Sequence, residues 1–260
     1  THDQSSAASD VYKRQENSQW VGMEAEGALS VGTDSLKILA ADSDGSEDLD
    51  SLIEDITDAV ITGLADYCRK SGITQIVLGL SGGIDSAVAA CVACAAVGPS
   101  NVLGIAMPSR FSSQHSLDDA KYTAEALGME FKIQPIDEMH SALEGQIDEV
   151  LDNGNPVASE NIQSRLRGII VMAHANAQSR MAIATGNKSE LAQGYCTLYG
   201  DMAGGYTPLG DLYKMQVYAL AEIFNERAKQ NGLQPPVNQS TLTKPPSAEL
   251  APDQKDEDSL

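Results

Sequence analysis

A glycine-containing loop, Ser81-Gly-Gly-Ile-Asp-Ser86, carries residue types suited to binding the phosphates of a nucleotide. It follows an apolar run from Ile76 to Leu80, typical of a buried parallel strand, and precedes a stretch rich in Ala, Val and Cys that predicts a helix. Glycine lets the backbone approach a ligand, and a helix N-terminus offers N–H groups to a phosphate. Ser81 and Ser86 add hydroxyl donors, and Asp85 adds a carboxylate that could hold Mg²⁺. The common nucleotide pattern GxxxxGK[ST] is absent.

A second polar group, Thr185-Gly-Asn-Lys-Ser-Glu190, follows another apolar run that predicts a strand. Thr185 offers a hydroxyl, Lys188 a point charge for a phosphate, and Glu190 a carboxylate for a cation. Because ligands of open parallel sheets lie outside the carboxyl ends of the strands, we expect both polar loops on one edge. Asp85 and Glu190 would then share one Mg²⁺.

Two further positions could contact a ligand. Asn161 and Arg165 are one helical turn apart, so they can grip one molecule together, although ordinary surface residues have the same spacing. Arg110 follows a predicted strand, where it could meet a phosphate or a carboxylate, or remain a solvated loop residue. We expect the same helix as Asn161 to bury an apolar stripe formed by Ile162, Leu166, Ile169, Ile170 and Ala173.

The elements that position these residues alternate between strands and helices. A helix predicted from Ser51 ends at Gly72, and it feeds the strand that precedes the glycine loop. Further strands are predicted at 102–107, 130–136 and 181–185, with a helix at 117–127 between two of them. This pattern predicts an α/β fold, a doubly wound, Rossmann-like parallel sheet with helices on both faces.

Composition narrows the functional classes. The 260 residues include 37 acidic and 17 basic side chains, giving a net charge of −20 that disfavours nucleic-acid binding. No run of about 18 apolar residues predicts a membrane span, and we see no signal-peptide pattern. Four cysteines in a chain of this length do not suggest a disulfide framework, so we expect a reducing cytoplasm.

Cys91-x-x-Cys94 lies within the predicted helix after the glycine loop. The pair could be a redox couple, metal ligands, or the sulfur-carrying site of a tRNA-thiolating enzyme. No second Cys/His pair at zinc spacing completes a site, so we favour two small side chains buried on one helix face.

The first 50 residues differ in composition and pattern from the rest of the chain. Residues 5–15 resemble the translation of a sequencing-library adapter, and 42–50 are acidic and polar. We therefore expect residues 1–50 to be a disordered segment without function, either non-native, a linker or the remnant of an upstream domain. We expect residues 51–260 to form one domain that is truncated at its C-terminal end.

Six motifs occur in the order found in NAD⁺ synthetases: Leu78 to Ser86, Met107 to Ala120, Glu160 to Arg165, Thr185 to Glu190, Tyr199 to Gly205, and Lys244 to Leu250. The resemblance covers 49–260 and implies an adenine nucleotide alpha hydrolase-like fold. In this family deamido-NAD⁺, ATP and ammonia give NAD⁺, AMP and pyrophosphate. The resemblance therefore implies a ligase that adenylates a carboxylate and then forms a C–N bond.

The resemblance also implies the role of particular residues. The ATP contacts it implies are Gly79, Leu80, Ser81, Gly82, Gly83, Ile84, Asp85, Ser86, Thr185, Lys214 and Ser247. The contacts with deamido-NAD⁺ that the resemblance implies are Asn161, Arg165, Glu190, Tyr195, Cys196, Thr197 and Leu198. Asp85 and Glu190 would take Mg²⁺, and together with Lys188 they would form the catalytic set.

The family has an ammonia-dependent and a glutamine-dependent form. Residues 107–120 and 198–205 look more like the glutamine-dependent form, whose upstream nitrilase-like domain supplies ammonia. Since few residues precede Ser81 and a lysine-bearing C-terminal segment has no counterpart, we expect a fragment of a longer enzyme. We also expect a homo-oligomer. The alternatives are another pyrophosphatase-loop enzyme, GMP synthetase-like or tRNA-modifying, and a nucleotide-binding module without catalysis.

Overall fold

The computed structural model describes residues 47–151, 155, 157–244 and 249–251, with side chains described from residue 51. Within these ranges no helix is both long and apolar enough to cross a membrane. The predicted Ser247 lies outside the described residues.

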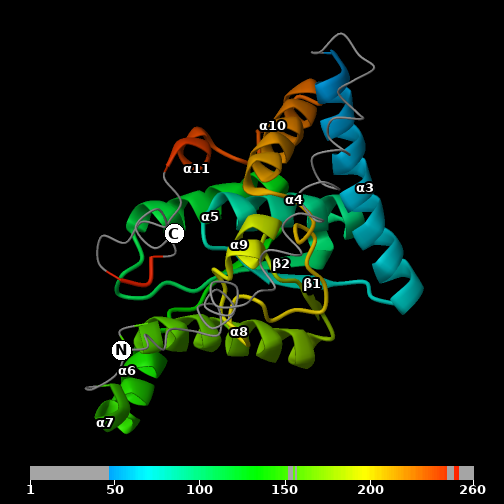
Figure 1. Ribbon diagram of the computed structural model, residues 1–260. Helices are drawn as coiled ribbons and strands as arrows, with labels where there is room; N and C mark the ends of the chain where they lie inside the picture. The colour runs from blue at the N-terminus through cyan, green and yellow to red at the C-terminus, as the bar shows by residue number, and fades with distance from the viewer. Residues whose placement is uncertain (1–46, 152–154, 156, 245–248, 252–260) are drawn as a thin grey trace, which may run out of the picture.

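A parallel sheet of four strands forms the centre of the molecule (Figure 1). The strands are β1 (Ile76–Gly79), β2 (Val102–Ala106), β3 (Glu130–Ile133) and β4 (Met181–Ala182), in the order β3-β2-β1-β4. All three pairings are parallel. The chain first builds outward from β1 through β2 to β3, and then returns to place β4 on the other side of β1. This reversal confirms the predicted doubly wound sheet.

Helices cover both faces of the sheet (Figure 1). One face carries α4 (Ile84–Val97) and α5 (Gln114–Leu127), with α3 (Glu47–Ser71) and α10 (Lys214–Gln230) packed on α4. The opposite face carries α8 (Val157–Gln178). The shorter helices are α6 (Asp137–Gln146), α7 (Asp148–Leu151), α9 (Lys188–Gln193) and α11 (Gln239–Thr243), and a 3-10 turn spans Pro99–Asn101.

Helix α4 is buried along most of its length because its small side chains let it lie close to the sheet. Cys91 and Cys94 are 1% and 8% exposed, as expected for small buried side chains. The Cys94 thiol lies 3.8 Å from the Met129 sulfur. Burial raises the pKa of the Cys94 thiol to about 12, so neither a thiolate nucleophile nor a metal ligand is favoured there.

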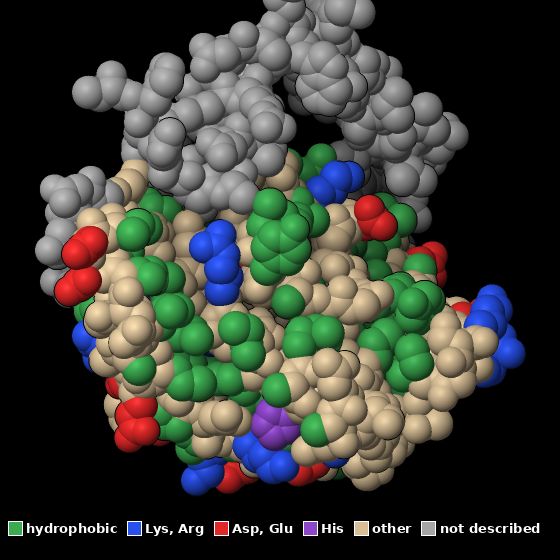
Figure 2. Space-filling model, turned by 90° about the horizontal axis from the view of Figure 1, so that it is seen from below, with side chains coloured by type: hydrophobic (Ala, Val, Ile, Leu, Met, Phe, Trp, Pro, Cys, Tyr) green, Lys and Arg blue, Asp and Glu red, His purple; other side chains and the backbone are tan. Residues whose placement is uncertain are grey.

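Three sequence predictions differ from the structure. Helix α3 begins at Glu47, before the predicted Ser51, although it ends as expected at Gly72, whose φ is 69°. The strands β1 to β4 end before the predicted limits. Ile169 on α8 is 61% exposed, so the predicted buried stripe is wrong at this position. The outer face of α8 exposes Met172 as well, and Figure 2 shows hydrophobic side chains on this side of the molecule.

Candidate functional site

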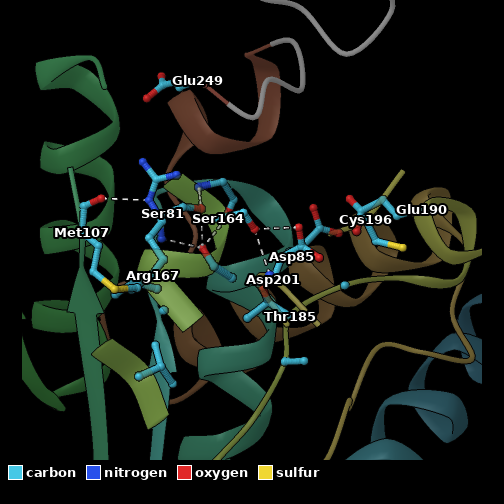
Figure 3. Close-up of a pocket in the computed structure, with 18 of the residues that line it drawn as sticks. Ser81, Asp85, Met107, Ser164, Arg167, Thr185, Glu190, Cys196, Asp201 and Glu249 are labelled. Carbon is cyan, nitrogen blue, oxygen red and sulfur yellow. Dashed lines mark hydrogen bonds between the residues drawn. The ribbon is translucent and has the colours of Figure 1, made fainter. Parts of the chain in front are cut away.

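A cavity of about 500 Å³ opens at the carboxyl ends of β1, β2 and β4. Figure 3 shows Met107 and Arg167 on one side of it and Asp85, Glu190 and Cys196 on the other. Most of the predicted site residues line this cavity: Gly79, Leu80, Ser81, Gly83, Ile84, Asp85, Ser86, Thr185, Glu190, Tyr195, Cys196 and Lys214. The topological reversal beside β1 therefore brings together residues from both polar loops.

The glycine loop is braced by its own serines. The Ser86 hydroxyl donates to the Gly83 carbonyl at 3.0 Å, and the Gly83 N–H donates to the Ser81 hydroxyl oxygen at 3.2 Å. The Ser81 N–H donates to the Ser86 hydroxyl oxygen at 3.2 Å. These bonds hold the loop in one shape directly before α4 begins at Ile84, so its backbone is organised without a ligand.

Gly82 lets the loop pack closely against the backbone of α5. Its φ is +83°, which side-chain-bearing residues rarely adopt, and a Cβ added there would lie 2.0 Å from the Ser116 carbonyl oxygen. Gly82 is not among the residues that line the cavity. A glycine in this loop was expected to allow close approach of a ligand, whereas at Gly82 it is the backbone of α5 that lies close.

Asp85 and Glu190 meet at one lysine. The Lys214 ammonium donates to Asp85 Oδ2 and lies 3.6 Å from Glu190 Oε1. Burial raises the pKa of the Glu190 carboxyl to about 7, and the nearby charge of Asp85 adds to the rise. Burial opposes the charged form of Lys214, but the two carboxylates outweigh it and raise the pKa of Lys214. The pair is thus arranged to hold positive charge.

The donor set of this pair fits Mg²⁺. The described residues contain no cluster of three or more His, Cys, Asp and Glu side chains that could hold a metal by themselves. However, Mg²⁺ is usually bound by one or two carboxylates together with water and the phosphates of a substrate. The two oxygens that face Lys214, one from each carboxylate, match that pattern.

Several predicted residues lie outside the cavity lining. The Lys188 ammonium lies 4.9 Å from the centre of the Tyr213 ring. Asn161 accepts a hydrogen bond of 2.7 Å from the Thr197 hydroxyl, and Arg165 Nε donates to the Leu198 carbonyl at 3.3 Å. Helix α8 therefore anchors the stretch that carries Tyr195 and Cys196. The contacts with deamido-NAD⁺ assigned to these residues stay predictions.

Arg110, for which a phosphate contact, a carboxylate contact and a solvated loop position were open, also lies outside the lining. Its guanidinium donates to the Ser141 hydroxyl at 2.8 Å and lies 3.5 Å from Glu144 Oε2, both on α6. Its backbone N–H donates to Asp137 Oδ1. Arg110 thus ties the loop after β2 to α6.

The sequence reasoning missed Arg167, which lines the cavity. Its Nε donates to the Met107 carbonyl at 3.0 Å, and burial lowers its pKa to about 10. Helical spacing was the available signal: Ser164, Gly168 and Val171 share its face of α8 and also line the cavity. The sequence pattern had instead indicated Arg165, which lies outside the cavity lining.

One side of the cavity is lined by three described residues that follow α11: Lys244, Glu249 and Leu250. Lys244 Nζ donates to Asp119 Oδ2 at 3.1 Å. The Glu249 carboxylate accepts hydrogen bonds from the Ser113 N–H and from the hydroxyls of Ser113 and Ser116 at the start of α5. The Leu250 carbonyl accepts a bond of 2.8 Å from Gln163 Nε2 on α8. Through Glu249 and Leu250 the chain therefore joins α5 and α8, which lie on opposite faces of the sheet.

Comparisons with known proteins agree on one family. The family model described as NAD synthase matches residues 56–260. A glutamine-dependent NAD(+) synthetase of Rhodobacter capsulatus is 49% identical over 207 residues, which cover 78% of this chain and 37% of that protein.

Solved structures are also similar. A glutamine-dependent NAD+ synthetase from Acinetobacter baumannii in complex with ADP has a TM-score of 0.71 and 33% identity, over 80% of this chain and 38% of that one. NMN synthetase from Francisella tularensis has a TM-score of 0.69 and 31% identity, over 80% of both chains. The chain thus spans less than two fifths of the glutamine-dependent proteins named here.

Proposed function

Because the chain belongs to the NAD synthase family, we propose that it amidates deamido-NAD⁺ with ATP and ammonia, releasing AMP and pyrophosphate. The observation that carries the proposal is the pairing of Asp85 and Glu190 on Lys214, beside the glycine loop and inside one cavity. A nucleotide-binding module without catalysis has no need for two partly buried carboxylates at this point.

The residue types suit the first step. A carboxylate is a poor electrophile, so its oxygen first attacks the α-phosphate of ATP and pyrophosphate leaves. Negative charge spreads over the phosphate oxygens, and positioned cations and N–H donors stabilise it. The backbone of 81–86 and the ammonium of Lys214 are such donors. Mg²⁺ held by Asp85 and Glu190 would supply further positive charge for the pyrophosphate.

The second step needs no protein nucleophile. Ammonia attacks the carbonyl carbon of the mixed anhydride, the C–N bond forms, and AMP leaves with the bonding electrons. Cys196 lines the cavity, but burial, helped by the charges of Asp201 and Glu190, raises the pKa of its thiol to about 11. The thiol therefore stays protonated near neutral pH, which supports direct attack by ammonia over a thioester.

The proposal also covers the nitrogen source, the oligomeric state and the location of the protein. The relatives named glutamine-dependent support glutamine as the nitrogen source, with ammonia released in another part of the protein. The exposed Ile169 and Met172 on α8 support a homo-oligomer. The acidic net charge supports an absence of nucleic-acid partners, and the free cysteines support a reducing cytoplasmic location.

The test supplies the chain with deamido-NAD⁺, ATP, MgCl₂ and ammonium chloride, and measures NAD⁺, AMP and pyrophosphate. We expect the three products in equal amounts, and their loss with Asp85→Asn. Pyrophosphate formed with xanthosine monophosphate instead would favour the GMP synthetase-like alternative. ATP binding without pyrophosphate in any arm would leave only a binding module.

A further inference from the structure

Asn187 is fully buried and connects both carboxylates of the proposed cation site. Its Nδ2 donates to Asp85 Oδ1 at 2.8 Å. Its Oδ1 accepts from the Glu190 backbone N–H at 3.0 Å, and its own backbone N–H donates to Glu190 Oε2 at 3.0 Å. One residue therefore contacts one oxygen of each carboxylate.

The direction of the Asn187 amide follows from its partners. The Glu190 N–H can only donate, so the amide oxygen must face it. The amide nitrogen must then face Asp85, where a carboxylate oxygen accepts. As the N-cap of α9, Asn187 needs only its side-chain oxygen, so the bond from its amide nitrogen to Asp85 is not needed to begin the helix.

These bonds decide which carboxylate oxygens remain for a cation. Asp85 Oδ1 and Glu190 Oε2 each accept a hydrogen bond from Asn187, whereas Asp85 Oδ2 and Glu190 Oε1 face the Lys214 ammonium. We propose that Asn187 is the positioning residue of the cation site, selecting the pair of oxygens that a divalent cation and Lys214 use during ATP activation. This inference rests on the proposed function.

The chain uses the same device at a second place. Asn238 is the N-cap of α11, and its Nδ2 donates to Asp119 Oδ1 at 2.7 Å. The other oxygen of Asp119 accepts from Lys244, which also lines the cavity. In both places an N-cap amide donates to one oxygen of a carboxylate and a lysine contacts the other, which at Asp119 also accepts from the Ser240 hydroxyl at 3.0 Å. This repetition argues that the arrangement at Asn187 orients a charged group.

The experiment compares Asn187→Ser with the wild-type chain. Serine keeps an N-cap oxygen but is too short to donate to Asp85. Mn²⁺ binding in the presence of a non-hydrolysable ATP analogue is measured by electron paramagnetic resonance. We expect the dissociation constant for Mn²⁺ to rise about 10–100-fold, as for other residues that orient metal ligands, with ATP binding in EDTA unchanged. Asn187→Thr serves the same purpose if the serine variant does not fold.

The matched control is Asn101→Ser, which removes a side-chain hydrogen bond of 2.7 Å to the Val97 carbonyl away from the cavity and should leave Mn²⁺ binding unchanged. Wild-type Mn²⁺ affinity in folded Asn187→Ser, with loss in Asp85→Asn, would reduce Asn187 to a helix cap. Unchanged Mn²⁺ affinity in both Asn187→Ser and Asp85→Asn would overturn the cation site and the positioning role of Asn187. NAD⁺ formation would in that case still support amidation. Weakened Mn²⁺ binding without NAD⁺ formation would overturn the amidation alone.

Discussion

Replacing Gly82 with alanine tests how the glycine loop is held. Alanine at φ +83° is strained, and its Cβ would lie 2.0 Å from the Ser116 carbonyl oxygen and 2.9 Å from the carbonyl carbon. Both atoms belong to the backbone of α5, so no side-chain rotation relieves the contact. Either the loop or the start of α5 must shift, and each carries residues that line the cavity.

The magnitude has two parts that can be separated. The left-handed conformation costs a non-glycine residue about 1–2 kcal/mol. The clash adds about 1–3 kcal/mol, as for other cases of overpacking. Gly72 is a matched control, because its φ is +69° and a Cβ there meets nothing within 4 Å. Gly72→Ala therefore has the strain without the clash.

Thermal unfolding of both variants isolates the clash. In a domain of this size 1 kcal/mol corresponds to about 2–4 °C, so Gly82→Ala should melt about 2–12 °C below Gly72→Ala. Calorimetric titration should show that only Gly82→Ala loses ATP affinity. Equal melting temperatures and equal ATP affinity in the two variants would refute the argument that the Ser116 backbone, together with the glycine, shapes this loop.

Two further predictions concern charged residues. Lys214→Ala should lower kcat/KM about tenfold more than Lys188→Ala, because only Lys214 lines the cavity and contacts the carboxylates, and equal losses in the amidation assay would contradict this. The Glu190 carboxyl has a pKa of about 7 in the fold against an ordinary 4.5, so between these pH values it ionises in the unfolded chain first and the fold loses stability. The stability of Glu190→Gln relative to wild type should therefore rise from pH 4.5 to pH 7 in melting curves. A stability difference that does not change with pH would show that the pKa of the Glu190 carboxyl is not raised.

The sheet was predictable from the sequence because its signal is local. The apolar runs at 76–80 and 102–107 became β1 and β2, and the strand–helix alternation gave the parallel topology. Only the strand ends differed, and single hydrogen bonds between neighbouring segments continue past them, as from the Leu80 N–H to the Ile105 carbonyl at 2.9 Å. The edge on which Asp85 and Glu190 meet followed from the rule for parallel sheets.

Side-chain direction was less predictable. Lys188 and Lys214 both follow loops near the cavity, but only Lys214 lines it. The Lys188 ammonium lies over the Tyr213 ring, a contact that the sequence does not reveal. Ile169 fits the helical period of its neighbours, yet it lies on the side of α8 that no described element covers. Gly82 is constrained by Ser116, a contact that no local pattern in either segment reveals.

The contacts that build the site join parts of the chain far apart in sequence. Asn187 and Asp85 are separated by 102 positions, Lys214 and Asp85 by 129, and Ser113 and Glu249 by 136. Loop closure of this length is slow compared with the formation of helices. During synthesis, β1, α4 and β2 emerge before α10, so the acidic pair gains Lys214 only after the start of α10 has left the ribosome. Recovery of nucleotide binding during refolding should therefore lag behind recovery of helical signal, and binding reports the last stage of folding.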